Sequence, residues 1–291
     1  MKGNKLIAFG WYGGKYSHLD WLLPLLPPTT HYCEPFGGSA AVLINREPSP
    51  VETYNDLHGD VVNFFKVLRE QGEELTRMIG LTPFSRAEFE DAISSNEKIT
   101  DLERARRFYV LARQVRTGLA QKASTGRWAH CKLTSRAGMA GAVSRWLGAV
   151  EDLPLIAQRL LRVQIESAPA IEVIQRYDNE ETLFYCDPPY PHESRGDANA
   201  YAFEMSNEQH RELAQVLHNV RGKVALSGYH SKLMDELYKN WHQTEADEKR
   251  CHSVKTPRKE ILWTNYSPRE TKKCQTLHQR QSIKTHQPSL I

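Results

Sequence analysis

The sequence predicts an α/β fold, in which short strands alternate with amphipathic helices. Two observations support this prediction. Residues 183–186 form a short apolar run rich in aromatic side chains, as in a buried strand, and residues 61–68 carry apolar side chains at helical spacing. In addition, the strands predicted near residues 6–9, 31–34, 51–55 and 183–186 each lead into glycines, prolines or acids. Ligands of doubly wound sheets bind at such strand ends.

Length and composition are those of an ordinary globular enzyme. The chain has 291 residues, of which 40% are hydrophobic and 25% charged. We find no apolar run long enough to span a membrane and no signal peptide. The five cysteines are scattered without a Cys-x-x-Cys pair, which argues against a disulfide framework and a zinc site. We therefore expect a cytoplasmic, reduced protein without a membrane partner or a metal.

The positive charge is unevenly distributed. The formal net charge is only +3, yet residues 104–145 contain Lys and Arg and no acid. Such a block favours a polyanionic partner, and a solvated basic helix face is the alternative. The polar tail, residues 268–291, is also basic and is predicted to be disordered.

The segment with the clearest chemistry is Asp187-Pro188-Pro189-Tyr190, directly after the strand at 183–186. The prolines cannot continue a central strand and make the turn stiff. The turn presents a carboxylate, a backbone carbonyl and an aromatic ring together. These groups match an amino group on a flat heterocycle, with two acceptors for its N–H bonds and a ring for stacking.

Two glycine-rich turns precede it. The first contains Trp11, Gly13, Gly14 and Lys15 but has Phe9 and Tyr16 where a phosphate-binding loop needs Gly and Ser or Thr. The second lacks the G-x-G-x-x-G spacing of dinucleotide sites and reads Glu34-Pro35-Phe36-Gly37-Gly38-Ser39.

The acid Asp56 follows the next predicted strand and is well placed to bind both hydroxyls of a ribose. Taken alone, Asp56 would more often be a helix cap. Glu34 puts an acid where a cationic cofactor would lie. Together the turns indicate an adenosine-containing cofactor that is not a dinucleotide.

The order and spacing of these four motifs resemble those of the Dam-type DNA adenine-N6 methyltransferases (D12 class, alpha group). The resemblance covers about residues 7–68 and 183–266. It implies a Rossmann-like S-adenosylmethionine-dependent methyltransferase sheet, mainly parallel and seven-stranded, with an inserted, mainly helical target-recognition domain. The implied cofactor is S-adenosyl-L-methionine, and the implied partner is double-stranded DNA. The predicted cofactor site comprises Trp11, Gly13, Gly14, Lys15, Glu34, Pro35, Phe36, Gly37, Gly38, Ser39, Asp56 and Asp187.

We assign residues 1–68 and 170–267 to the catalytic domain and residues 69–169 to the inserted, DNA-binding domain. Helices are expected near 73–79, 83–93 and 102–115, followed by a loop or hairpin over residues 116–141. The candidates for phosphate or base contacts are Arg113, Arg116, Lys122, Arg127, Lys132 and Arg136. We expect the protein to act as a monomer.

The resemblance implies site-specific methylation of adenine N6. Asp187 and the Pro188 carbonyl would accept the two N–H bonds, Pro189 would shape the pocket, and Tyr190 would stack on a base flipped out of the duplex. The alternatives are an N4-cytosine or RNA methyltransferase on the same fold, or a non-catalytic DNA-binding relative. Cytosine enzymes of this kind typically resemble Ser-Pro-Pro-Tyr, and protein-glutamine enzymes resemble Asn-Pro-Pro-Tyr, which favours adenine here.

Overall fold

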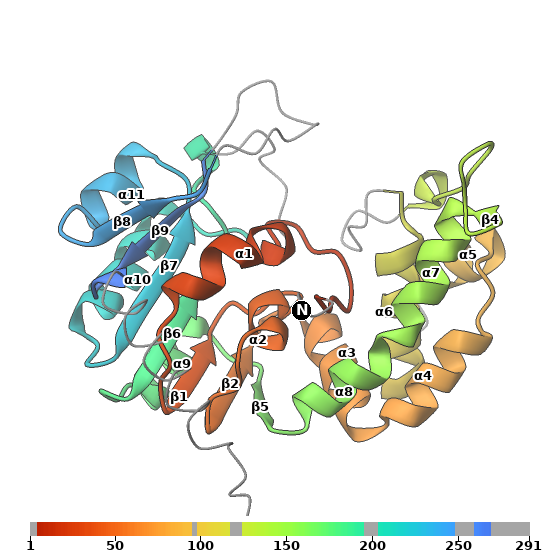
Figure 1. The fold of residues 1–291 in the computed structure, drawn as a ribbon, viewed down its shortest axis with the longest axis horizontal. Helices are drawn as coiled ribbons and strands as arrows, with labels where there is room; N and C mark the ends of the chain where they lie inside the picture. The colour runs from red at the N-terminus through yellow and green to blue at the C-terminus, as the bar shows by residue number, and fades with distance from the viewer. Residues whose placement is uncertain (1–4, 95–97, 117–123, 195–202, 248–258, 269–291) are drawn as a thin grey trace, which may run out of the picture.

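A seven-stranded sheet forms the centre of the molecule (Figure 1). The computed structural model describes residues 5–94, 98–116, 124–194, 203–247 and 259–268. Within these residues the strand order is β5-β2-β1-β6-β7-β9-β8, with β9 antiparallel to both its neighbours. The predicted α/β class and the mainly parallel seven-stranded sheet are thus confirmed. The strands are β1 (His31–Glu34), β2 (Val51–Asn55), β5 (Val163–Glu166), β6 (Thr182–Cys186), β7 (Lys223–Gly228), β8 (His242–Glu245) and β9 (Ile261–Thr264).

Three strands differ from the prediction, among them β5, which lies within residues 69–169 assigned to the inserted domain. Residues 6–9 form no strand, because the Leu6 amide and carbonyl bond the side chain of Asn45 at 2.8 and 2.7 Å instead of a strand partner. The unpredicted β8 has side chains that are mostly exposed, so its sequence lacks the apolar pattern of a buried strand.

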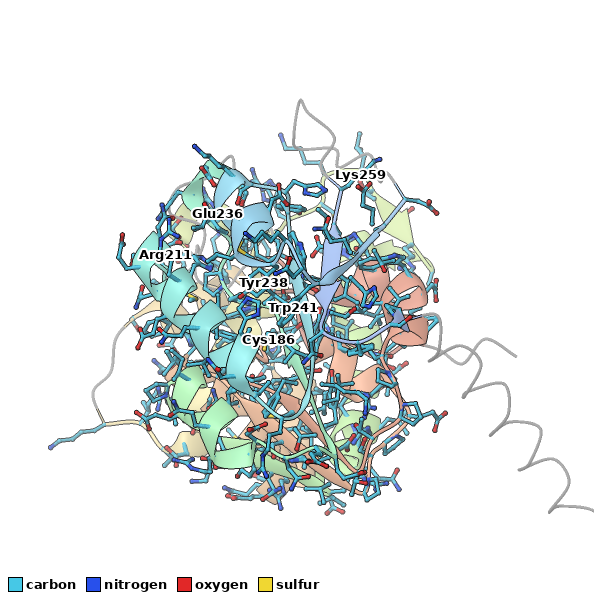
Figure 2. The ribbon with its side chains drawn as sticks, turned by 90° about the vertical axis from the view of Figure 1, so that its left-hand side faces the viewer. Cys186, Arg211, Glu236, Tyr238, Trp241 and Lys259 are labelled. Carbon is cyan, nitrogen blue, oxygen red and sulfur yellow. The ribbon has the colours of Figure 1, made fainter. Side chains whose placement is uncertain are left out.

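Helices cover both faces of the sheet, and alternate residues of each strand serve opposite faces. Cys33, Phe184 and Cys186 face a core formed with α9 (Ala170–Tyr177), α10 (Asn207–Asn219) and α11 (Lys232–Leu237). Figure 2 shows this layer, with Tyr238 and Cys186 inside and Arg211 and Glu236 at the surface. A capping box of Ser206 and Gln209 starts α10.

The opposite core is formed by Tyr32, Tyr54, Leu183 and Tyr185 with the remaining helices near the sheet. These helices are α1 (Leu19–Leu22), α2 (Ala41–Asn45) and α3 (Gly59–Glu70), with the short η1 (Lys15–His18) and η2 (Leu23–Leu25).

A helical segment lies between α3 and β5 and projects from one side of the sheet (Figure 1). It contains a β-hairpin of β3 (Ser135–Arg136) and β4 (Met139–Ala140), which confirms the predicted loop or hairpin there. The predicted boundary at residue 169 is wrong, because β5 pairs with β2 in the main sheet and the segment ends before residue 163. Its helices are α4 (Gly72–Leu81), α5 (Arg86–Ile93), α6 (Asp101–Gln114), α7 (Gly141–Glu151) and α8 (Leu153–Leu160), with η4 (Thr125–Arg127).

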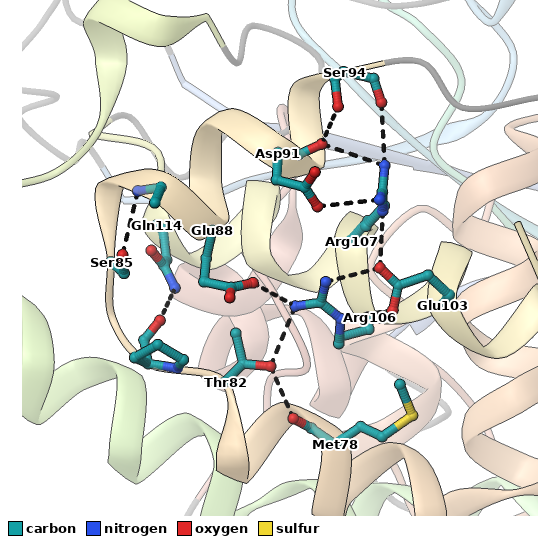
Figure 3. A network of polar contacts seen from close by, with 12 residues as sticks. Met78, Thr82, Ser85, Glu88, Asp91, Ser94, Glu103, Arg106, Arg107 and Gln114 are labelled. Carbon is teal, nitrogen blue, oxygen red and sulfur yellow. Dashed lines mark hydrogen bonds and ion pairs between the residues drawn. The ribbon is translucent and has the colours of Figure 1, made fainter.

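Arginines of α6 hold the helical segment together, as Figure 3 shows. Arg106 binds Glu103 and Glu88 at 2.7 and 2.9 Å, and Arg107 binds Glu103 and Asp91 at 2.8 and 3.0 Å. The Arg107 side chain is only 12% exposed. The acids come from outside the basic block, so part of its charge is neutralised within the fold.

Across the part of the chain that the structure describes, no helix combines the length and hydropathy needed to cross a bilayer. Nearly all of the tail predicted to be disordered, from residue 269 onward, lies outside the described residues.

Candidate active site

The strand order reverses at the pair β1 and β6, and the site is built at their carboxyl ends. From β1 the chain continues outward to β2 and β5, and β6 then pairs with the other side of β1. Ligands of open α/β sheets bind at such a reversal. Glu34 ends β1 and Asp187 follows the last residue of β6, so parallel pairing brings both acids to one edge.

A cavity of about 720 Å³ opens at this edge, a size typical of small-molecule sites. It brings together residues of all four sequence motifs, including Lys15, Asp56, Asp187 and Pro189. Pro188 and Tyr190 are buried beside these residues. The cavity is lined by every residue predicted to bind the cofactor: Trp11, Gly13, Gly14, Lys15, Glu34, Pro35, Phe36, Gly37, Gly38, Ser39, Asp56 and Asp187.

Lys15 reaches the Asp187-Pro188-Pro189-Tyr190 turn directly. Its Nζ lies 2.7 Å from each oxygen of the Asp187 carboxylate and 2.7 Å from the carbonyl oxygen of Gly13. The predicted role of this lysine was cofactor binding, and the structure adds an ion pair with Asp187. Burial raises the pKa of Asp187, while Lys15 acts in the opposite direction.

Tyr190 is held by its hydroxyl group. The hydroxyl lies 3.0 Å from Asp187 Oδ1 and also donates to Glu260 Oε1, while the ring packs edge-on against Tyr229. The side chain is 3% exposed, so stacking of Tyr190 on a base stays a prediction. Glu260 was not predicted as a site residue. The signal available in the sequence is an acid directly before the apolar run 261–263.

The second glycine turn is tightly packed. A Cβ atom on Gly37 would lie 2.1 Å from the Tyr54 ring, and one on Gly38 would lie 2.7 Å from the Trp11 ring. Gly38 also has a φ of +49°, which disfavours other residues. The turn therefore requires glycines, and this lets its backbone line the cavity directly.

Asp56 is tied to this turn rather than to a helix. Its Oδ2 accepts a hydrogen bond from the Gly38 amide at 2.8 Å, and its Oδ1 accepts one from the His58 amide at 2.7 Å. Burial raises the pKa of Asp56, and both amides oppose this. The carboxylate has more acceptor sites than the backbone amides use, so the group retains capacity for a ligand hydroxyl.

Glu34 is buried at the same edge of the sheet, where it lines the cavity. Its Oε1 accepts the hydroxyl of Tyr32 at 2.7 Å. Burial raises the pKa of the Glu34 carboxyl to about 8, although Tyr32 and the nearby Arg46 act in the opposite direction. Glu34 therefore has a buried carboxyl that a bound cation would ionise.

The predicted DNA-contacting residues fall into two groups. Arg113 is engaged within the fold, where its guanidinium donates to the carbonyls of Ala8 and Ile7 at 2.8 and 2.6 Å. The four others that the structure describes are exposed in or near the hairpin region: Arg116, Arg127, Lys132 and Arg136. Lys122 lies outside the described residues. In Figure 1 the hairpin lies at the upper end of the helical segment, the side toward which the carboxyl ends of β6 and β7 also point.

The cavity also contains residues that sequence reasoning missed. His58 and Phe203 meet edge to face, and His58 likewise meets Trp11. His58 and Phe203 belong to none of the sequence motifs, and only the fold brings them together. The other unpredicted lining residues nearby include Glu172, Met205, Gln209 and Glu212.

Comparison with known proteins adds an independent finding. The family described as D12 class N6 adenine-specific DNA methyltransferase matches residues 11–254. A curated relative, the DNA N-6-adenine-methyltransferase of Escherichia phage P1, is 26% identical over 242 residues. The match covers 79% of this chain but 30% of the phage protein, so the chain spans less than a third of that protein's length.

Two solved structures of an rRNA methyltransferase, aviRa from Streptomyces viridochromogenes, were also matched. Their TM-scores are 0.37 and 0.34 and their identities 10% and 12%, and each alignment covers 86% of this chain and 81% of the other. Likeness at this level supports no statement about function.

Proposed function

Because this chain belongs to the D12 class N6 adenine-specific DNA methyltransferases, we propose that it methylates adenine N6 in duplex DNA with S-adenosylmethionine as methyl donor. The observation that carries the proposal is the position of Asp187. Its carboxylate lines the same cavity as the Gly37-Gly38 turn and Asp56, so an amine acceptor and a cofactor site share one space.

The residues present fit S-adenosylmethionine. Asp56 offers a carboxylate to the ribose, the glycine turn lets the ligand approach the backbone, and the buried Glu34 complements a positive charge. When bound, this cofactor supplies an electrophilic methyl group on a positively charged sulfur. The proposed holding set is Trp11, Gly13, Gly14, Glu34, Pro35, Phe36, Gly37, Gly38, Ser39 and Asp56.

Asp187 has the main chemical role in this proposal. Adenine N6 is a poor nucleophile because its lone pair is delocalised into the ring. If N6 donates one hydrogen bond to Asp187 and a second to the Pro188 carbonyl, these two bonds would draw the lone pair out of conjugation and orient it. N6 becomes positively charged as it gains a methyl group, and the carboxylate stabilises that charge. Asp187 is then also the nearest base for the proton that N6 loses.

The remaining assignments follow from the same scheme. The target base would be flipped out of the duplex at a cost of a few kcal/mol. Exposed Arg116, Arg127, Lys132 and Arg136 would contact the DNA, whereas the engaged Arg113 is left out of this set.

The deciding experiment is transfer of a labelled methyl group from S-adenosylmethionine to unmethylated genomic DNA, followed by nucleoside chromatography. Label in N6-methyl-2′-deoxyadenosine is the expected result. Label in cytosine would keep the methyl donor but overturn the role given to Asp187. Absence of label from DNA, with the cofactor still bound, would overturn the proposal and direct the search to RNA or protein.

A further inference from the structure

A second acid, Glu260, lies beside the catalytic turn because of the sheet topology. It directly precedes β9, which pairs with β7 in the antiparallel sense and places Ile261 opposite Gly228. β9 therefore begins at the edge where β6 and β7 end. The Glu260 carbonyl accepts the Ala246 amide at 2.8 Å, which fixes the backbone, and the residue is 4% exposed. A buried acid held this firmly beside Asp187 calls for a functional account.

Glu260 competes with Asp187 for the proton of Tyr190. The Tyr190 hydroxyl donates to Glu260 Oε1 and also lies 3.0 Å from Asp187 Oδ1. A phenol has one proton, so it donates to only one of these carboxylates at a time. While the Tyr190 hydroxyl donates to Glu260, it does not donate to Asp187 Oδ1.

Glu260 also competes for Lys15. The ammonium of Lys15 has three protons but four nearby acceptors: both Asp187 oxygens and the Gly13 carbonyl at 2.7 Å, and Glu260 Oε1 at 3.3 Å. In this arrangement Lys15 covers both Asp187 oxygens. An amino group meets less competition at Asp187 when Lys15 and Tyr190 turn to Glu260, because Lys15 donates to both oxygens and the Tyr190 hydroxyl lies against Oδ1.

We propose that Glu260 is a positioning residue, which accepts hydrogen bonds from Lys15 and Tyr190 so that an Asp187 oxygen becomes open to the amino group of the target base. The inference rests on the proposed function and deepens it. Covalent bonds are unchanged in this step, because one Lys15 hydrogen bond moves from Asp187 to Glu260. Lys15 keeps a carboxylate partner throughout, and the buried positive charge stays compensated.

The charge of Glu260 provides a specific signature. Burial raises the pKa of Asp187, Lys15 lowers it, and Glu260 raises it further. Removal of the Glu260 charge therefore lowers the pKa of Asp187, because a neighbouring like charge opposes ionisation. The acidic limb of the rate profile then moves to lower pH. The titratable groups around Asp187 and Glu260 are Lys15, Glu34, Tyr185, Cys186, Tyr190 and Tyr229.

The test is single-turnover methyl transfer to DNA by the full chain, at saturating S-adenosylmethionine and DNA, over a series of pH values. Glu260→Gln keeps the size of the side chain and an acceptor for Tyr190 but removes the charge. We expect its plateau rate to fall roughly 10- to 100-fold, the scale of a misplaced reacting group, and its acidic limb to move to lower pH. Its affinity for S-adenosylmethionine is expected to stay unchanged.

Two further variants separate charge from packing. Glu260→Asp keeps the charge but shortens the side chain, so we expect a rate between those of Glu260→Gln and wild type, with the acidic limb near that of wild type. Glu245→Gln removes an exposed acid of β8 that lies opposite Ile261 of β9. This variant is expected to change neither the plateau rate nor the acidic limb.

A folded Glu260→Gln protein with the wild-type rate and the wild-type acidic limb would overturn the inference. If that variant does not fold, the Glu260→Asp rate decides, and a wild-type rate there overturns it. A different outcome is wild-type protein that transfers no methyl group to adenine. That outcome would overturn the proposed function itself, and the inference with it.

Discussion

Lys15 and Asp187 are 172 positions apart in the chain, yet the Lys15 Nζ lies 2.7 Å from both oxygens of the Asp187 carboxylate. The lysine belongs to the first glycine turn and the aspartate to the turn after β6. The pair therefore joins the predicted cofactor site to the predicted catalytic turn. It also means that the carboxylate proposed to accept the target amine is already paired with a cation.

Replacement of Asp187 by alanine is expected to lower the methyl-transfer rate at least roughly 10²-fold, by analogy with loss of one transition-state partner. Binding of S-adenosylmethionine should be retained, which calorimetry can measure on the same preparation. The half-buried Asp235, paired with His230, provides the control, since Asp235→Asn should leave the rate unchanged. Equal rates for Asp187→Ala and wild type would remove Asp187 from the mechanism.

Affinity for S-adenosylmethionine should rise with pH up to about 8. Burial raises the pKa of Glu34 to about 8, so most of this carboxyl is protonated in the free protein at neutral pH. A cationic ligand favours the ionised form, so binding releases a proton and becomes tighter as the pH approaches that pKa.

S-adenosylhomocysteine is the matched ligand, because its sulfur is uncharged. Its affinity should rise less than that of S-adenosylmethionine over the same range, and Glu34→Gln should abolish the difference between the two. Parallel pH profiles for both ligands in the wild-type protein would show that Glu34 does not sense the sulfonium charge. Without ligand, the stabilisation from neutral Glu34 is fully present below its unfolded pKa and is lost as the pH rises through about 8.

Alanine at Gly37 should destabilise the fold and weaken cofactor binding, because its Cβ would lie 2.1 Å from the Tyr54 ring. Overpacking of this kind costs about 1–3 kcal/mol. Gly148→Ala is the control, since a Cβ there meets nothing within 4 Å in the middle of α7. That control should stabilise the protein by about 0.5–1 kcal/mol. Denaturant unfolding measures both, and a stabilised Gly37→Ala would contradict the packing of the turn.

The buried Glu52 should stabilise the fold without taking part in catalysis. Its side chain is fully buried and binds the Arg159 guanidinium through two contacts of 2.6 and 2.8 Å, which joins β2 to α8. Arg159→Ala leaves this carboxylate without its main partner and should cost roughly 3–5 kcal/mol of unfolding free energy.

The exposed pair Arg77 and Glu74 offers the comparison, because Arg77→Ala should leave the unfolding free energy almost unchanged. Similar losses of unfolding free energy in Arg159→Ala and Arg77→Ala would mean that burial does not determine how strongly these ion pairs stabilise the fold.

DNA affinity should fall with salt, and the hairpin region should account for part of the slope. Each phosphate contact that is lost reduces the slope of log affinity against log salt by about 0.9. Lys132→Ala combined with Arg136→Ala should therefore flatten the slope if both residues contact phosphates. Lys239→Ala removes an exposed charge between α11 and β8, at the sheet edge opposite the site, and should not alter it. A slope unaffected by the double variant would make the hairpin a solvated face.

The sequence by itself determined the α/β class, the motifs of the site and the helices α3, α4, α5 and α6. This was possible because each of these depends on local chemistry: apolar runs form β6 and α6, glycines are required in the turn at Gly37, and a capping box begins α10. The tertiary structure alone decided which of these charged groups meet. Glu260 joins the site because β9 runs antiparallel to β7, and Arg106, Arg107 and Arg113 are withdrawn from the basic block by partners in the folded chain. A local pattern contains no information about such contacts, because they form between residues that are distant in the chain and adjacent only after folding.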